Sequence, residues 1–169
     1  MPARRNPLAR LVLVGLPIAF TRVMAWLPLP AVRVVGKYVG RTAYYLIPRL
    51  RKVALGNLEL AYGSTLSARR KRQIARGASE NMGIVAAEFG HVPRLHTGDF
   101  GRFVSFEGLE HVDRERGFAT ISAHFGNWEW VPAALRNMGY ETAVVYRPLD
   151  DPAQDNAVNK IRQSGGVTT

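Results

Sequence analysis

The sequence predicts an α/β fold, in which a basic helical region precedes βαβ units of a parallel sheet. Two observations predict it. Up to about residue 92, apolar residues recur at helical spacing among many Lys and Arg. From Pro93 onward, short apolar runs alternate with helix-type segments, as strands joined by helices do. We therefore expect two parts, residues 1–92 and residues 93–169.

The charge of the chain is unevenly distributed. Residues 1–76 carry 15 Lys or Arg and one acid, Glu59, which is a net charge of +14, whereas residues 77–169 carry 8 Lys or Arg and 12 acids. The basic front is expected to face something anionic: a phospholipid surface, nucleic acid or an acidic protein. The absence of cysteine excludes disulfides, thiolate metal ligands and a cysteine nucleophile.

The N-terminus favours a membrane. Apolar residues fill 11–20 and 23–32, separated by Arg22 and preceded by three arginines, Arg4, Arg5 and Arg10. No run reaches the roughly 18 apolar residues of a clean spanning helix, and Arg22 at a bilayer centre would cost about 2.5–3.5 kcal/mol. No small-residue cleavage site marks a signal peptide. A helix in the membrane interface fits best, with a spanning anchor or a buried core helix as alternatives.

Helical spacing continues over residues 31–62, with a break expected near Pro48 and a stop at Gly63. Ser67 is predicted to cap a long helix that ends near Gly90. Five cations crowd the start of this helix, where its dipole disfavours them: Arg69, Arg70, Lys71, Arg72 and Arg76. They form either a solvated face or a surface for headgroups or an acidic partner. Nucleic acid is not expected, because interleaved aromatics and RNA-binding motifs are missing.

The second part is predicted to alternate strands and helices. Its expected elements are a strand 102–107, a helix 108–116, a strand 118–122, a helix 128–138 followed by Gly139, a strand 142–146 and a helix 154–162. In open parallel sheets, functional groups collect at the carboxyl ends of strands. His124 and Arg147 both follow predicted strands, so we expect them at one edge of the sheet.

His124 and Glu129 are candidates for acid–base chemistry. A neutral imidazole nitrogen can take a proton from a hydroxyl, and a carboxylate on the other nitrogen fixes the tautomer. Gly126 permits a tight turn between the two residues. Without a nearby serine elbow or cysteine, the pair is predicted to activate a substrate hydroxyl directly. A zinc site is not expected, because the spacing does not place both residues on one helical face. A histidine that caps a structural turn remains the alternative.

The block His124–Glu129 resembles the His-x-x-x-x-Glu/Asp block of glycerolipid-type acyltransferases. It is most similar to the version in the bacterial lipid A biosynthesis acyltransferases, the lauroyl/myristoyl acyltransferase family. Four further stretches resemble that family: the basic run 51–58 ending in Asn-Leu, residues 107–111, the Tyr-Arg-Pro block 146–150 and residues 159–162.

The resemblance implies an O-acyltransferase at the cytoplasmic face of the bacterial inner membrane. The donor would be an acyl thioester of acyl carrier protein or coenzyme A, and the acceptor a membrane glycolipid, such as a lipid A precursor. It implies that His124 is the general base, that Glu129 orients it, and that Arg147 stabilises an oxyanion or holds a phosphate. Asn127 would be either a helix cap or a further donor near the thioester. No metal and no cofactor are expected.

Two alternatives stay open. One is acylation of phosphatidylinositol mannosides from acyl-CoA, and the other is a non-catalytic membrane-surface module. Members of the family continue past the Tyr-Arg-Pro helix with further strands, so we expect residues 93–169 to be an incomplete part of the α/β domain. We also expect the chain to be a fragment or a truncated product, with an unpaired sheet edge.

Overall fold

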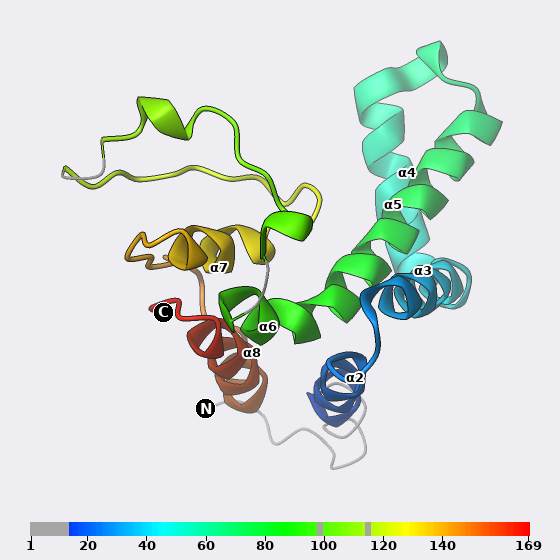
Figure 1. The fold of residues 1–169 in the computed structure, drawn as a ribbon. Coiled ribbons are helices and arrows are strands. Elements are labelled where there is room, and N and C mark those ends of the chain that lie inside the picture. The colour runs from blue at the N-terminus through cyan, green and yellow to red at the C-terminus, as the bar shows by residue number, and fades with distance from the viewer. Residues whose placement is uncertain (1–13, 98–99, 114–115) are drawn as a thin grey trace. The chain divides into compact units, whose positions relative to one another are not determined.

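A computed structural model describes residues 14–97, 100–113 and 116–169, and helices make up most of the first of these ranges (Figure 1). The described residues form two compact units. One unit is Trp26–Glu88, and the other joins the residues up to Ala25 with Phe89–Thr169. The division of the chain between residues 92 and 93 stays a prediction.

The unit Trp26–Glu88 is built from three long helices with local start and stop signals. The helices are α3 (Leu29–Leu46), α4 (Pro48–Tyr62) and α5 (Ala68–Glu88), with a 3-10 turn η2 (Gly63–Thr65) before α5. The predicted break is confirmed, since Pro48 opens α4 where a missing backbone N–H costs nothing. Gly63 ends α4 with a positive φ of 45°, and the Ser67 hydroxyl accepts from the backbone N–H of Arg70 at 3.2 Å.

Glycines let α3 and α5 pack with their backbones in contact. The buried residues of α3 recur every four positions: Val32, Gly36, Gly40 and Tyr44. A Cβ added at Gly40 would lie 2.1 Å from the carbonyl oxygen of Ser79, and one added at Gly83 would lie 2.2 Å from that of Gly36. Any side chain at these positions would force the helices apart.

Ion pairs flank this seam. Arg33 bonds Glu88 at 2.5 Å, and Arg41 bonds Glu80 at 2.7 Å. The hydrogen bond from Arg41 lowers the pKa of Glu80, so the carboxylate stays ionised at neutral pH.

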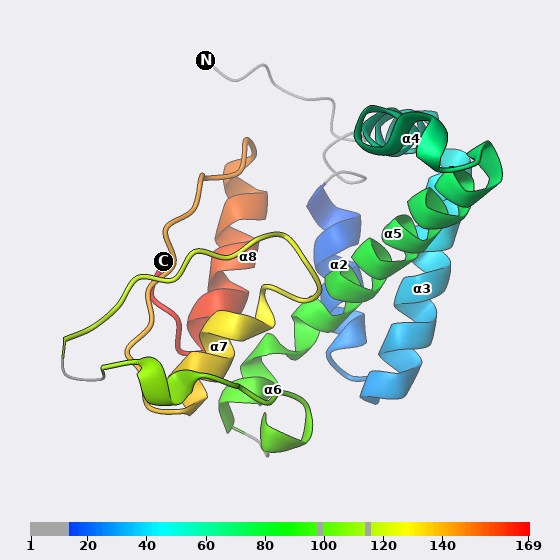
Figure 2. The ribbon, with the colours of Figure 1, turned by 90° about the horizontal axis from the view of Figure 1, so that it is seen from above.

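The second unit packs short helices around a small apolar core. Its helices are α2 (Leu16–Met24), α6 (Val92–Thr97), α7 (Trp130–Asn137) and α8 (Pro152–Ser164), with 3-10 turns η3 (Phe89–His91), η4 (Phe100–Arg102) and η5 (Leu109–His111). Figure 2 shows α6, α7 and α8 beside one another, and residues of α6 contact both other helices. The side chains of Val92, Leu95, Trp130, Ala133 and Ala134 are buried here.

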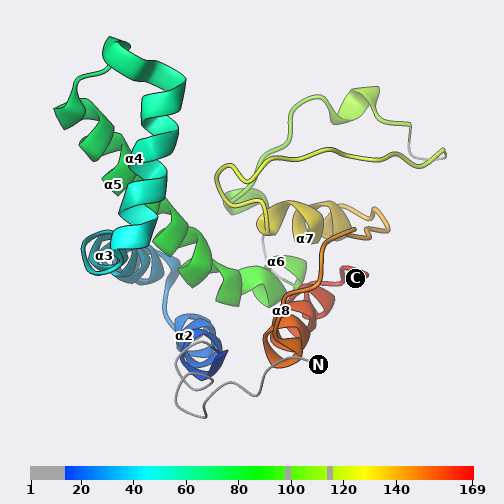
Figure 3. The ribbon, with the colours of Figure 1, turned by 180° about the vertical axis from the view of Figure 1, so that it is seen from behind.

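The predicted parallel sheet is wrong: the described residues form an all-helical fold. The strand-type segments 102–107, 118–122 and 142–146 run without a ladder, and the described chain contains one isolated parallel bridge, between Ala143 and Thr168. Figure 3 shows the first two segments drawn as loops, without arrows. Of the predicted helix 108–116, η5 is the described helical part.

The physical reason lies in what a strand requires. Apolar and β-branched residues favour extended backbone, but a strand is stabilised by ladder hydrogen bonds and by burial of one face. Here Ile121 and Val145 are fully exposed, at 102% and 101%. These segments therefore lack the partners and the buried face that would turn them into a sheet.

Among the described residues, no helix is long and apolar enough to cross a bilayer. Arg4, Arg5, Arg10 and the start of the apolar run at residue 11 lie outside the described residues.

Candidate functional site

The turn that carries His124 leads directly into α7. Gly126 has a φ of +59°, a conformation that favours glycine, as the tight turn required. The backbone N–H of Phe125 donates to the carbonyl of Ala123 at 2.8 Å. The His124 imidazole is exposed and lies against Trp128, with 4.6 Å between ring centroids. The turn therefore presents His124 to solvent on an aromatic support.

Glu129 is fixed by a partner from α8. Both of its carboxylate oxygens accept from the Arg162 guanidinium, Oε2 from Nε at 3.0 Å and Oε1 from Nη2 at 2.6 Å. Each side chain is only 15% exposed, so water competes little for this bidentate pair. The hydrogen bond to Glu129 raises the pKa of Arg162 above its usual value. The pair joins the start of α7 to the last turn of α8.

Arg162 also links Glu129 to the Tyr-Arg-Pro block. Its guanidinium carbon lies 5.1 Å from the centroid of the Tyr146 ring, within cation–π range. The Tyr146 hydroxyl accepts from the side-chain amide of Asn159 and donates to Asp155 at 3.4 Å. The other Asp155 oxygen accepts from the backbone N–H of Leu149 at 2.9 Å. Residues 146–149 are thereby fastened to α8, which Asp151 caps at its start.

The structure separates the four predicted site residues into two kinds. Glu129 is held by Arg162, and the side-chain oxygen of Asn127 is buried. His124 and Arg147 are exposed, and the Arg147 guanidinium lies 3.7 Å from an Asp150 carboxylate that is itself 82% exposed. No hydrogen bond joins His124 to Glu129 in the described part of the chain. Their catalytic pairing stays a prediction.

The described residues include no group of three His, Asp or Glu side chains placed to hold a metal ion. The turn itself carries the exposed imidazole of His124 and the carboxylate of Glu129, which Arg162 holds in place.

A family model for bacterial lipid A biosynthesis acyltransferases matches residues 4–168. The chain belongs to this family. The resemblance expected from its motifs is confirmed, and the match gives the chain an acyltransferase role. Neither a curated protein nor a solved structure matches it.

Within this lipid A acyltransferase family member, sequence reasoning missed Arg162 and Tyr146 as partners of the site. The stretch 159–162 resembled the family, but nothing in it indicated which acid Arg162 would bond. The spacing of Asn159 and Arg162, three residues apart on α8, places both on the helical face that receives Tyr146. That spacing was the sequence feature from which the contacts of α8 with Tyr146 could have been predicted.

Proposed function

We propose that this chain transfers a fatty acyl group from an acyl thioester to a hydroxyl of a membrane glycolipid, with a lipid A precursor as the acceptor. The family match over residues 4–168 is the observation that carries the proposal. The donor is acyl carrier protein or coenzyme A, and the reaction takes place at the cytoplasmic face of the inner membrane. The exposed imidazole on the turn before α7 supports a site open to a lipid substrate.

In the proposed reaction, neutral His124 accepts the proton of the acceptor hydroxyl as the oxygen attacks the thioester carbonyl. The new C–O bond gives a tetrahedral intermediate, whose collapse breaks the C–S bond. The imidazolium returns the proton to the leaving thiolate, so the enzyme ends as it began. The exposed Arg147 stabilises the oxyanion or holds an acceptor phosphate. Asn127 donates a hydrogen bond near the thioester.

Glu129 serves this reaction from a fixed position. A carboxylate offers about four acceptor sites on its two oxygens, so the two bonds from Arg162 leave room for one from an imidazole N–H. Arg162 keeps the carboxylate in place, and the proposal requires the His124 ring to turn from Trp128 toward it. Glu129 then stabilises the imidazolium that forms.

The test compares two histidine variants of the full chain in membranes. His124→Ala should lower transfer of labelled acyl groups from acyl carrier protein to a lipid A precursor by about 10²–10⁴-fold, the usual share of a general base. His111→Ala is the matched control, because its imidazole is 83% exposed and lies 3.6 Å from the exposed carboxylate of Glu110. Its transfer rate should stay unchanged.

Equal rates for the two variants would refute the role of His124 and favour a non-catalytic membrane module. The same assay with acyl-CoA and a phosphatidylinositol mannoside tests the other acceptor. If transfer to the phosphatidylinositol mannoside is faster, that lipid and not the lipid A precursor is the acceptor.

A further inference from the structure

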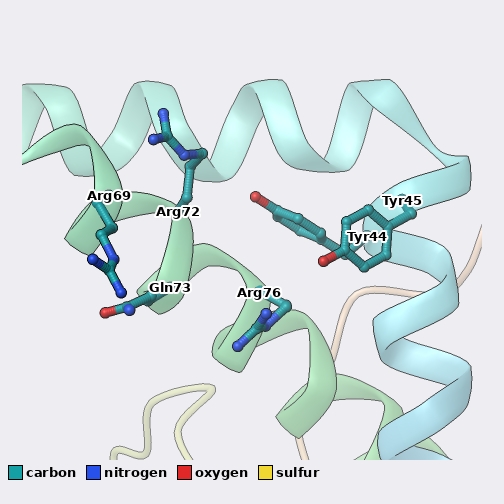
Figure 4. Close-up of a pocket in the computed structure, with 6 residues that line it drawn as sticks. All are labelled: Tyr44, Tyr45, Arg69, Arg72, Gln73 and Arg76. Atoms are coloured by element: carbon teal, nitrogen blue, oxygen red, sulfur yellow. The ribbon is translucent and has the colours of Figure 1, made fainter.

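The strongest unexplained feature is a concave basic site in the unit Trp26–Glu88. A cavity of about 290 Å³ is lined by six residues, Tyr44, Tyr45, Arg69, Arg72, Gln73 and Arg76. Figure 4 shows the four α5 side chains on one side and the two tyrosine rings of α3 on the other, with both hydroxyls toward α5. Positions 69, 72, 73 and 76 form one stripe of the helix, so three guanidinium groups share one face.

All carboxylates of this unit are bonded to cations. Residues 26–88 contain eleven Lys or Arg and three acids. Glu59 bonds Lys71, Glu88 bonds Arg33, and Glu80 bonds Arg41. The unit is left with a net charge of +8.

Within the cavity, only Arg76 reaches a carboxylate. It lies 3.4 Å from Glu80, which Arg41 holds more closely, at 2.7 Å. In the part of the chain that the structure describes, no carboxylate is within ion-pair distance of Arg69 or Arg72. Both are exposed.

The placement of these cations at the start of α5 does not stabilise the folded chain. Arg69 and Arg72 stand three residues apart in the first turns of α5, where like charges repel and the helix dipole disfavours cations. The lining offers guanidinium and phenol donors, a set that suits a ligand rich in acceptor oxygens. Arginine forks match the oxygens of a phosphate group, and several of them neutralise its charge.

We propose that this cavity binds the phosphate group of an anionic lipid headgroup. The neighbouring helix α4 favours a lipid as the carrier of the phosphate over a free anion. None of its residues is buried, and it exposes large apolar side chains, with Leu60 at 91% and Val53 at 55%. Arg49 and Lys52 lie on the same helix. A helix with exposed apolar and basic side chains is suited to a membrane interface.

The site goes beyond the proposed acyl transfer, because it concerns other residues and binding alone. Its test is vesicle binding by the full chain, measured by co-sedimentation. Phosphatidylcholine vesicles carry either phosphatidic acid or oleate at equal surface charge. The first offers a phosphate monoester, and the second a carboxylate. We expect the chain to bind the phosphatidic acid vesicles about tenfold more tightly, as two or three charge-assisted hydrogen bonds would allow.

The double variant Arg69→Gln/Arg72→Gln should abolish this preference. The matched control Arg49→Gln/Lys52→Gln removes the same charge from α4 and should weaken binding to both vesicles by one common factor, keeping the preference. Because Arg69 and Arg72 are exposed, their loss opens no cavity, and circular dichroism should show an intact fold.

Three results would overturn the proposal. One is an equal effect of the two double variants on both vesicles, which leaves a general basic surface. Another is inorganic phosphate or glycerol phosphate that saturates the cavity while phosphatidic acid vesicles gain nothing, which identifies a soluble ligand. The third is polyglutamate that binds through Arg69 and Arg72 more tightly than either vesicle, which identifies an acidic protein.

Discussion

Arg162 differs from the arginines at the start of α5 in what neutralises its charge. Arg162 is 15% exposed and holds both oxygens of Glu129, whereas Arg69 and Arg72 are exposed, with no carboxylate at ion-pair distance in the described chain. A buried charge requires a partner, but an exposed one does not. The comparison teaches that Arg162 connects parts of its own unit, while the cations of α5 are available to an anion outside the chain.

The largest effect is expected where the partly buried pair of Glu129 and Arg162 is broken. Arg162→Met leaves the Glu129 carboxylate with little water and without its partner, so the free energy of unfolding should fall by about 1–3 kcal/mol, the cost of leaving such a group unsatisfied. Arg147→Met is the control, because its guanidinium is 90% exposed, and it should change stability by less than about 0.5 kcal/mol. Urea unfolding of the full chain measures both.

A double-mutant cycle then isolates the pair. Glu129→Gln combined with Arg162→Met should cost less than the sum of the single changes, because the double variant has no unpaired charge. Equal urea midpoints for Arg162→Met and Arg147→Met would erase the distinction between a partly buried, paired arginine and an exposed one.

Sequence reasoning succeeded where structure depends on neighbouring residues. The break at Pro48, the cap by Ser67 and the stop at Gly63 follow from local backbone rules, and all three are present. The seam of α3 and α5 was missed, although Gly36 and Gly40 stand four residues apart, because the spacing does not name the facing Gly83.

The failures involve distant partners. The segments 118–122 and 142–146 have the composition of strands, but a strand also needs a ladder, and composition does not supply it. The bond from Arg162 to Glu129 was missed for the same reason, because the two residues are 33 positions apart in the sequence. The chain has many cations, and the fold determines that Arg162 is the one that bonds Glu129.

A smaller effect is expected on vesicle binding when the charge around the exposed arginines of α5 is changed. Glu80→Gln raises the net charge by one and releases two arginines from the carboxylate, Arg41 and the cavity residue Arg76. Affinity for phosphatidic acid vesicles should rise about fivefold relative to oleate vesicles, since one basic charge near a membrane surface contributes about 1 kcal/mol. Glu59→Gln adds the same charge outside the cavity and should raise both affinities equally. Identical behaviour of the two variants would deny Arg76 a place in the site.

The smallest effect concerns the stability of α5 itself. Arg72→Gln removes a cation from the start of the helix and its repulsion from Arg69 and Arg76, each about 0.2–0.5 kcal/mol. Thermal unfolding at low salt should therefore show unchanged or slightly increased stability, and added salt should shrink any gain, because it screens the repulsion. A loss above about 1 kcal/mol would make Arg72 a structural arginine like Arg162. The contrast between a charge satisfied inside the fold and a charge kept for an external anion would then fail.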